Sequence, residues 1–277
     1  MTRRRSLPIA ILSIEGTNCD EELATALREL GANPEIVHLK QLMGFEVPRD
    51  RRRRLLEYAA AFVPGGFSAG DYVRAGAIFA ARIRSAIGPE LEAFVRDGRT
   101  LGGICNGFQV LTELGLLPGR GHGRLGSPEA ALMTNDSNRF ECRPTYIAWD
   151  GGEFPPLTTW PKGTTLYAPS AHAEGKLVLA GPPGEKLREL EANGQVVFRW
   201  VTPDGTPGGY PWNPNGSAGN VAGICNPNGN VFGMMPHPER AFFRLQRPDW
   251  TRDGRTDGLG DGARFLDAVL THAERRS

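Results

Sequence analysis

The chain has 277 residues, of which 40% are hydrophobic and 23% are charged, so it can bury a substantial core. Its 32 Lys and Arg residues balance 31 Asp and Glu residues, which leaves a formal net charge of +1. A chain with so little net charge has no overall field that would attract nucleic acid or an anionic membrane. We therefore expect a globular protein that binds neither, and whose partners must be sought in local sites.

The first residues imitate a secretory signal, because three arginines precede the apolar run PIAILSI. The run stops at Glu15-Gly16 without a small-residue cleavage site, so a buried first strand is the better interpretation. No segment approaches the length of a membrane-spanning helix. The four cysteines are far apart and form no CxxC pair, which suggests neither a zinc site nor a dense disulfide framework. A reducing, cytoplasmic location fits this pattern best.

The N-terminal half alternates short apolar runs with amphipathic segments. Strands are predicted at 8–14, 35–39, 60–66 and 100–105, and helices at 23–30, from 51 onward, within 76–97 and at 108–115. This alternation predicts a mainly parallel sheet with helices on both faces. The Arg51 to Arg54 run is interpreted as an exposed helical face rather than a nucleic-acid patch, given the balanced charge.

After about residue 127 the pattern changes to short strands separated by frequent turns. These strands are predicted at 140–149, 164–169, 176–181, 195–201, 220–225 and 230–235, followed by a last helix at 261–274. They suggest an antiparallel or mixed extension of the same sheet. No internal repeat or interdomain linker is evident, so we expect one domain over residues 1–277.

The sequence Gly-Ile-Cys-Asn occurs twice, and its surroundings separate the two cysteines. Cys225 is followed by an Asn-Gly hairpin signal, so it is expected to pack at a strand end. Cys105 lies between the apolar strand TLGGI and the helical pattern FQVLTELG, with Gly103 and Gly107 beside it. A cysteine at such a sharp strand-to-helix turn is typical of a nucleophile elbow. A buried structural cysteine is the alternative.

The position of Cys105 favours a reactive sulfur, because a helix N-terminus stabilises anions and lowers the pKa of a thiol. The backbone N–H of Asn106 could donate to an oxyanion, and Gln109 lies one helical turn further on. The turn VPGGFSAGD at 63–71 should meet Cys105 at the same edge of a parallel sheet, where Gly65 or Gly66 could supply a second donor.

A cysteine nucleophile needs a base, and two His-x-Glu pairs compete for that role. His237 and Glu239 follow an apolar strand, and the flanking prolines favour an extended backbone in which both side chains point the same way. His172 and Glu174 follow a less clear strand. These patterns favour His237 as the base, although the residues alone do not decide between the two pairs.

Nucleotide binding by this chain is not expected. The segment GHGRLG at 121–126 matches GxGxxG, but it follows a helix rather than a strand, and there is no P-loop.

Together these motifs resemble the class I (triad) glutamine amidotransferases, and within them the glutaminase component of phosphoribosylformylglycinamidine synthase. The resemblance covers nearly the whole chain and is carried by GTNCDEE, PGGFSAGDYVRAGAI, GICNGFQVL, NDSNRFECR, AHAEGK, NPNGSAGNVAGICN and MMPHPER. It implies the flavodoxin-like α/β fold of that family, a central mainly parallel sheet flanked by helices with an antiparallel extension. The sequence departs from the family pattern at two places. Its opening reads IEGTNCD where a proline is expected before the glycine, and the segment 247–262 resembles the tail of the large fused form.

The same resemblance implies the site and its chemistry. Cys105 would be the nucleophile, His237 the base and Glu239 its orienter, with Gly65, Gly66 and Asn106 around the oxyanion. The glutamine pocket would be lined by Gln109, Asn135, Ser137 and Phe140. L-Glutamine would be hydrolysed to glutamate and ammonia through a cysteinyl thioester.

The implied partners receive the ammonia. An ATP-dependent synthetase subunit, which would hold ATP and Mg, would use it to amidate formylglycinamide ribonucleotide in purine biosynthesis, and a small bridging subunit would join the complex. No cofactor or metal is expected in this chain. The alternatives are a DJ-1-like cysteine hydrolase, a glutaminase subunit that serves another amidotransferase, and a non-catalytic binding module.

Overall fold

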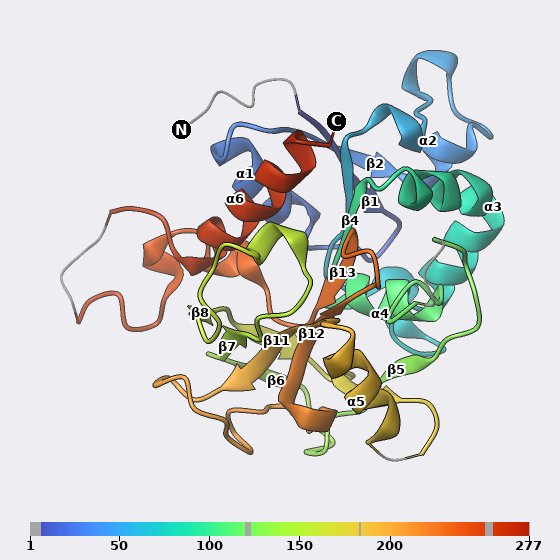
Figure 1. Ribbon diagram of the computed structural model, residues 1–277. Coiled ribbons are helices and arrows are strands. Elements are labelled where there is room, and N and C mark those ends of the chain that lie inside the picture. Colours follow the sequence, from blue (N-terminus) through green and yellow to red (C-terminus); the bar gives the residue numbers. More distant parts are fainter. Residues whose placement is uncertain (1–6, 120–122, 183, 253–256, 277) are drawn as a thin grey trace.

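A nine-stranded sheet forms the centre of the computed structural model, which describes residues 7–119, 123–182, 184–252 and 257–276 (Figure 1). The strand order is β2-β1-β3-β4-β13-β12-β11-β7-β8. The strands are β1 (Pro8–Ser13), β2 (Asn33–His38), β3 (Ala60–Val63), β4 (Thr100–Ile104), β7 (Tyr146–Trp149), β8 (Thr165–Tyr167), β11 (Val196–Val201), β12 (Val221–Cys225) and β13 (Val231–Met234). The expected signal-like residues 1–6 and part of GHGRLG lie outside the described residues.

The first five strands in this order are parallel and carry the main helices. β1 pairs with β2 and β3, and β4 pairs with β3 and β13, all in parallel. This is the flavodoxin-like order, so the predicted fold class is confirmed. Figure 1 shows α1 (Asp20–Glu29) and α6 (Asp261–Glu274) on one face of the sheet, with α3 (Ala77–Arg96) and α4 (Asn106–Glu113) on the other.

The remaining strands extend the sheet in antiparallel fashion, as expected. β12 pairs with β13 and β11, and β7 pairs with β11 and β8, all antiparallel. Two further pairs lie apart from this sheet: β5 (Ala130–Met133) with β10 (Lys176–Leu179), and β6 (Glu141–Arg143) with β9 (Ser170–His172). The predicted strand 176–181 therefore belongs to a separate small sheet, and the expectation that it extends the main sheet was wrong.

Two other predicted elements differ from the structure. The strand expected at 140–149 is divided into β6 and β7 at Pro144-Thr145, because proline has no N–H to donate to a ladder. The helix expected from Arg51 is absent from this described stretch, which instead forms two 3₁₀ turns, Arg49–Arg51 and Leu55–Glu57. Glu35 explains part of this: it accepts from Arg53 Nε at 2.6 Å and from Tyr58 Oη at 2.5 Å, which holds the segment along β2.

Four short elements were not predicted from the sequence: α2 (Leu39–Met43), β5, β9 and α5 (Glu185–Ala192). Both helices lack a long apolar stripe, since each buries a single residue, Leu39 in α2 and Leu190 in α5. None of the helices in the described part of the chain is long and apolar enough to cross a membrane.

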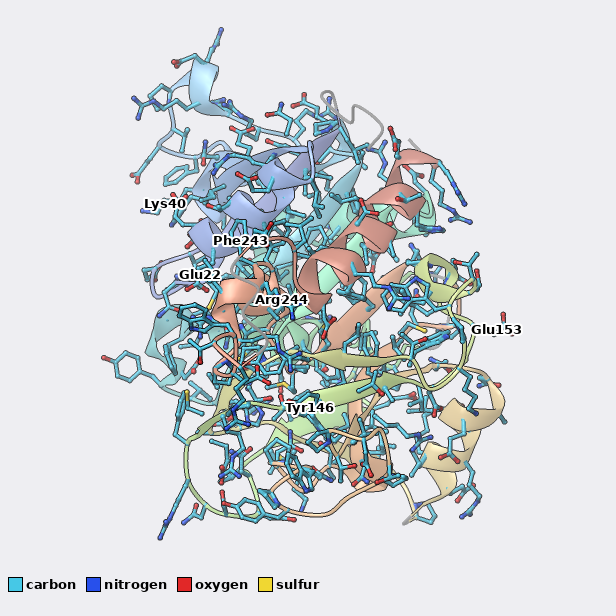
Figure 2. All side chains as sticks on the ribbon, turned by 90° about the vertical axis from the view of Figure 1, so that its left-hand side faces the viewer. Glu22, Lys40, Tyr146, Glu153, Phe243 and Arg244 are labelled. Carbon is cyan, nitrogen blue, oxygen red and sulfur yellow. The ribbon has the colours of Figure 1, made fainter. Side chains whose placement is uncertain are left out.

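The core joins the two halves of the sheet. Phe232 of β13 is fully buried, and its ring centroid lies 6.3 Å from Phe62, 5.2 Å from Phe154 and 5.8 Å from Phe265. Segments far apart in the sequence also meet: Figure 2 shows Glu22 of α1 near the segment that carries Phe243 and Arg244, and Arg240 Nε donates to Glu22 Oε2 at 2.7 Å.

The carboxyl ends of four neighbouring parallel strands converge on one edge of the sheet. The loop after β1 carries Cys19, the loop after β3 carries Gly65, β4 leads directly into Cys105, and β13 leads into His237. Because ligands of open α/β sheets bind at this edge, the topology brings together residues that are far apart in the sequence.

Candidate active site

Cys105 occupies a strained turn between β4 and α4. It is the N-cap residue of α4, with φ 51° and ψ −108°, in a region that non-glycine residues rarely adopt. Such a conformation costs on the order of 1–3 kcal/mol and persists only where the surroundings impose it. The bond from Cys105 N to Met234 O, 2.8 Å long, fixes this turn against β13. The geometry is that of a nucleophile elbow.

Glycines on either side of the elbow allow α4 to approach the sheet. A Cβ at Gly107 would lie 1.8 Å from Val63 O, and one at Gly103 would lie 2.6 Å from Gly107 O. Only residues without a side chain fit these two positions, so the small residues beside Cys105 are there for close packing.

His237 and Glu239 form a buried pair. His237 Nδ1 lies 2.6 Å from Glu239 Oε1, and both side chains are almost completely inaccessible. The contact is not made along an extended chain, as the sequence suggested, because residues Pro238–Ala241 form a 3₁₀ turn. The turn brings the carboxylate back onto the ring, and the bond from His237 N to Pro169 O at 2.8 Å holds the backbone in place.

The charges around His237 favour its protonated form. Burial lowers its pKa, but the Glu239 carboxylate and the Cys105 sulfur raise it, and the net direction is well above the ordinary value. The Cys105 sulfur is thus close enough to the His237 ring to affect its protonation. His237 Nε2 has no partner with hydrogen-bond geometry among the described residues, and the Cys105 sulfur lies 3.6 Å from Ala171 O. Such loose contacts are common before substrate binds.

The competing pair, His172 and Glu174, is not a pair in the structure. His172 Nδ1 lies 3.2 Å from Asn135 Oδ1, while Glu174 Oε2 accepts from Ala75 N at 3.1 Å. Burial, followed by the charge of His237, lowers the pKa of His172 to about 3. A histidine that stays neutral and has an amide for a partner lacks the carboxylate that would make it a strong base.

Gly65 packs between three side chains that follow β1, β4 and β13. A Cβ on Gly65 would lie 2.7 Å from His237 Cε1, 3.1 Å from Cys19 Sγ and 3.4 Å from Cys105 Cβ. Gly66 has φ +139°, and its Cβ would lie 2.7 Å from Asn18 Oδ1. The Asn106 N–H is the first of α4, and such N–H groups have no partner within the helix. Gly65 and Asn106 therefore both lie next to Cys105.

Side-chain hydrogen bonds join the turn after β3 to the start of α4, and the sequence does not predict these bonds. Asn106 Oδ1 accepts from Ser68 Oγ at 2.5 Å, and its amide donates to Asp71 Oδ1 at 3.3 Å and to Gln109 Oε1 at 2.9 Å. Gln109 Nε2 donates to Glu174 O at 2.6 Å. Ser68 and Asp71 belong to the turn VPGGFSAGD. The sequence predicts that this turn lies near Cys105, but it does not predict that these two side chains contact Asn106.

The other predicted pocket residues have different surroundings. Asn135 is buried and its side chain is engaged with His172, which makes it a support for the wall of the site. Ser137 Oγ is buried without a partner among the described residues. Phe140 is 49% exposed, and its ring centroid lies 6.2 Å from that of Phe67, for which the sequence carries no functional signal.

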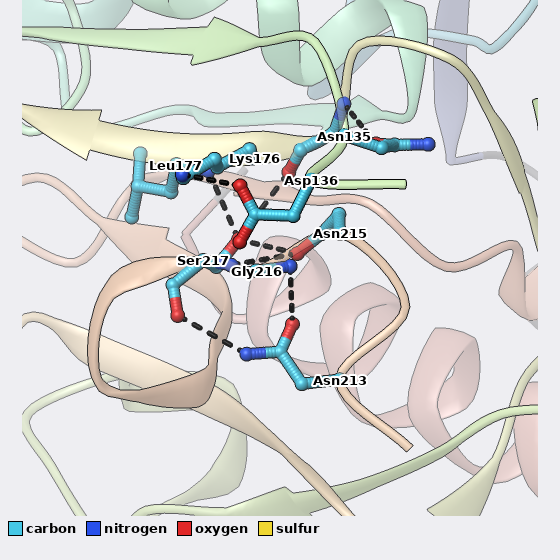
Figure 3. Close-up of polar contacts among 9 residues, drawn as sticks. Asn135, Asp136, Lys176, Leu177, Asn213, Asn215, Gly216 and Ser217 are labelled. Carbon is cyan, nitrogen blue, oxygen red and sulfur yellow. Dashed lines mark hydrogen bonds and ion pairs between the residues drawn. The ribbon is translucent and has the colours of Figure 1, made fainter. Parts of the chain in front are cut away.

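A polar network supports the loop that contains Asn135 (Figure 3). Asp136 N donates to Asn215 O at 3.2 Å, and Asp136 Oδ1 accepts from Lys176 Nζ at 2.5 Å. Ser217 Oγ accepts from Leu177 N at 2.9 Å and donates to Asn215 Oδ1 at 2.7 Å. The NPNGS and AHAEGK blocks thus hold one wall of the site in place.

The remaining cysteines differ from Cys105 in their surroundings. Burial raises the pKa of Cys225 to about 12, as expected for a packed thiol at a strand end. Cys142 is exposed, and all four cysteines are free.

Comparisons with known proteins agree with this geometry. Residues 6–269 match the family model of the CobB/CobQ-like glutamine amidotransferase domain. Phosphoribosylformylglycinamidine synthase subunit PurQ from Archaeoglobus fulgidus is 46% identical over 275 residues, which cover 98% of this chain and 99% of that protein. The Thermus thermophilus subunit of the same name is 40% identical over 90% of this chain and 93% of its own length.

Solved structures show the same fold. A chain in the structure of PurLQS from Thermotoga maritima is similar with a TM-score of 0.69 and 30% identity, covering 96% of this chain and 98% of that one. The glutaminase domain of Trypanosoma brucei CTPS, with bound acivicin, has a TM-score of 0.52 and 14% identity over 96% of this chain and 94% of its own, and supports the fold alone. This chain belongs to the CobB/CobQ-like glutamine amidotransferases and, within them, to the PurQ family, the glutaminase component of phosphoribosylformylglycinamidine synthase.

Proposed function

We propose that Cys105 releases ammonia from L-glutamine through a thioester, with His237 and Glu239 as its base and orienter. The observation that carries this proposal is the buried His237–Glu239 pair, 2.6 Å apart, at the strand edge where Cys105 forms its elbow. A raised pKa of His237 supports an imidazolium in the resting site, which is the partner that a thiolate nucleophile requires.

The reaction balances as two half-steps. The Cys105 thiolate attacks the carboxamide carbon, and the imidazolium of His237 gives its proton to the departing nitrogen, so that ammonia leaves and a γ-glutamyl thioester remains. Neutral His237 then takes a proton from water, and the hydroxide attacks the thioester. Glutamate leaves, and Cys105 and His237 return to thiolate and imidazolium.

Each tetrahedral intermediate carries a negative oxygen that needs donors. The Asn106 N–H at the start of α4 and an N–H of Gly65 or Gly66 lie on adjacent loops and are our candidates. Glu239 keeps the ring oriented and offsets its positive charge. Gln109, Asn135, Ser137 and Phe140 are our candidates for the walls of the glutamine pocket.

The ammonia must reach an acceptor before it becomes ammonium in solvent. The names of the PurQ relatives and of the PurLQS structure support a synthetase subunit as partner. We infer that this partner holds ATP and Mg and amidates formylglycinamide ribonucleotide, that a small bridging subunit joins the complex, and that this chain needs no cofactor. Four free cysteines support a reducing, cytoplasmic location.

The alternatives receive less support. A DJ-1-like hydrolase or a non-catalytic module would not account for a family match over residues 6–269 together with the buried His237–Glu239 pair. Service to another amidotransferase is disfavoured by the PurQ relatives, which are up to 46% identical.

Glutamate release from glutamine tests the proposal, measured with and without the synthetase subunit. Cys105→Ala should lower the rate at least about 10³-fold, because it removes the nucleophile. Cys225→Ala, the matched change in the second GICN sequence, should retain activity. Loss of activity in the Cys225 variant alone would overturn the assignment.

A further inference from the structure

Cys19 is a buried thiol at the active site that the glutaminase mechanism does not use. It follows β1 and is the N-cap residue of α1, and its N–H donates to Gly65 O at 3.3 Å. Its sulfur lies 3.1 Å from the position a Gly65 Cβ would occupy, and His237 Cε1 lies 2.7 Å from the same position. The thiol therefore faces the catalytic imidazole.

Three side chains at this point offer the donor atoms that zinc prefers. One ligand atom each from Cys19, His237 and Glu239 lie within 4.8 Å of one another, and all three residues are buried. Thiolate, imidazole and carboxylate bind Zn²⁺ at about 2.0–2.3 Å, so the ligands of one ion lie roughly 3–4 Å apart. Side-chain shifts of about 1 Å would close the set.

One buried oxygen in the set has unused capacity. Glu239 Oε2 lacks a hydrogen-bond partner among the described residues, whereas Glu239 Oε1 contacts His237 Nδ1 at 2.6 Å. A buried carboxylate oxygen without a partner is unfavourable, and a bound cation would offset this cost.

The charges near Cys19 are compatible with a thiolate ligand. Arg240 Nη2 donates to Cys19 Sγ at 3.3 Å, and the guanidinium is itself paired with Glu22 at 2.7 Å. Burial is the main cause that raises the pKa of Cys19, opposed by the nearby His237 ring, so the free thiol carries a proton that a metal must displace.

We propose that Cys19, His237 and Glu239 form a binding site for one Zn²⁺ ion, whose occupancy stops glutamine hydrolysis. The ion takes the base and its orienter away from Cys105, and the thiol proton and the proton between His237 and Glu239 pass to the buffer. Local Cys spacing could not reveal this site, because its ligands follow two strands at opposite ends of the chain. The inhibition rests on the proposed roles of His237 and Glu239, whereas binding does not.

Metal binding is measured directly on the purified chain with Co²⁺, whose thiolate ligands give a charge-transfer absorption, and with Zn²⁺ in competition against a chromophoric chelator. Wild type and Cys142→Ser, the exposed-cysteine control, should bind one equivalent. Cys19→Ser and Glu239→Gln should each weaken binding at least about tenfold. Cys105→Ala should keep the thiolate absorption, because the ligand sulfur is that of Cys19.

Glutamine hydrolysis is assayed in parallel, each variant against its own metal-free rate. The Zn²⁺ concentration for half inhibition should rise in Cys19→Ser by the same factor as its dissociation constant, with Cys142→Ser unchanged. Wild-type affinity in Cys19→Ser, or an absorption lost in Cys105→Ala and kept in Cys19→Ser, would overturn the site. If Cys19→Ser fails to fold, Glu239→Gln decides, and wild-type affinity there contradicts the proposal. Absence of hydrolysis in metal-free wild type would count against the glutaminase mechanism while the absorption still tests the site.

Discussion

At the scale of single residues, the two buried histidines respond to their surroundings in opposite directions. Burial and the charge of His237 lower the pKa of His172 to about 3, whereas the Glu239 carboxylate and the Cys105 sulfur outweigh burial and raise that of His237. Each of these histidines is the first residue of a His-x-Glu sequence. The difference arises from which acceptor each ring meets, and only the fold determines that.

The low pKa of His172 predicts acid sensitivity. In the unfolded chain a histidine binds a proton near pH 6.5, but native His172 does not until about pH 3, so stability falls as pH drops through this window. Between pH 7 and pH 5 this group should cost about 2 kcal/mol, at 1.36 kcal/mol per pH unit below its unfolded pKa. The raised pKa of His237 acts in the other window, since its contribution is full below about pH 6.5 and is lost as pH rises further.

Urea unfolding at pH 7 and pH 5 measures this effect. In His172→Gln the loss of unfolding free energy between the two pH values should be smaller than in wild type by about 2 kcal/mol. Equal losses in the two proteins would show that His172 does not stay neutral in the native state.

The elbow residue could be predicted because its neighbours are local in the sequence. Gly103, Cys105 and Gly107 follow an apolar strand and precede a helical pattern, so the turn is encoded in one short stretch. Cys19 and Arg240 could not be predicted in the same way. They reach the site only because the strands before them lie in one parallel sheet.

At the scale of elements, the walls of the site are held by loops rather than by the sheet. The loop with Asn135 is braced by the residues of NPNGS (Figure 3), and Ser217 links that block to the start of β10. The sequence showed these blocks as family motifs without their partners, because hydrogen bonds between distant loops leave no periodic pattern.

Ser217→Ala should destabilise this wall. The change leaves Leu177 N without its acceptor and removes one of the two donors to Asn215 Oδ1, the other being Ser217 N, which should lower the free energy of unfolding by about 1–3 kcal/mol. Thr158→Ala is the control, since its hydroxyl bonds to Pro155 O at an exposed position. A Ser217 variant as stable as the Thr158 variant would contradict the bracing role.

Element boundaries were predicted well where burial is periodic and badly where side-chain contacts decide. The parallel strands and α1, α3, α4 and α6 follow their apolar patterns, whereas the stretch after Arg51 is held extended beside β2 through Glu35. Local helix preference cannot anticipate such a contact.

At the scale of the whole molecule, the two halves of the sheet share one core. The Phe232 ring contacts the rings of Phe62 in β3, Phe265 in α6 and Phe154, so both halves of the sheet depend on this side chain. We infer from this shared core that the chain is one domain.

Phe232→Ala should lower the free energy of unfolding by about 3–5 kcal/mol, because it leaves a cavity at the centre. Phe45→Ala, at a position 66% exposed, should change it by no more than about 0.5 kcal/mol. Calorimetry should show a single transition in each protein. Two separate transitions in wild type, with only one moved by the Phe232 change, would contradict a single domain.

We propose that the sheet edge where β1, β3, β4 and β13 end makes the Cys105 sulfur the nucleophile. The most direct measurement is peptide mapping by mass spectrometry after treatment with a glutamine-like diazoketone. We expect one covalent adduct, on Cys105, that excess glutamine prevents and that His237→Ala slows. An adduct on Cys19, Cys142 or Cys225 in its place would contradict the account.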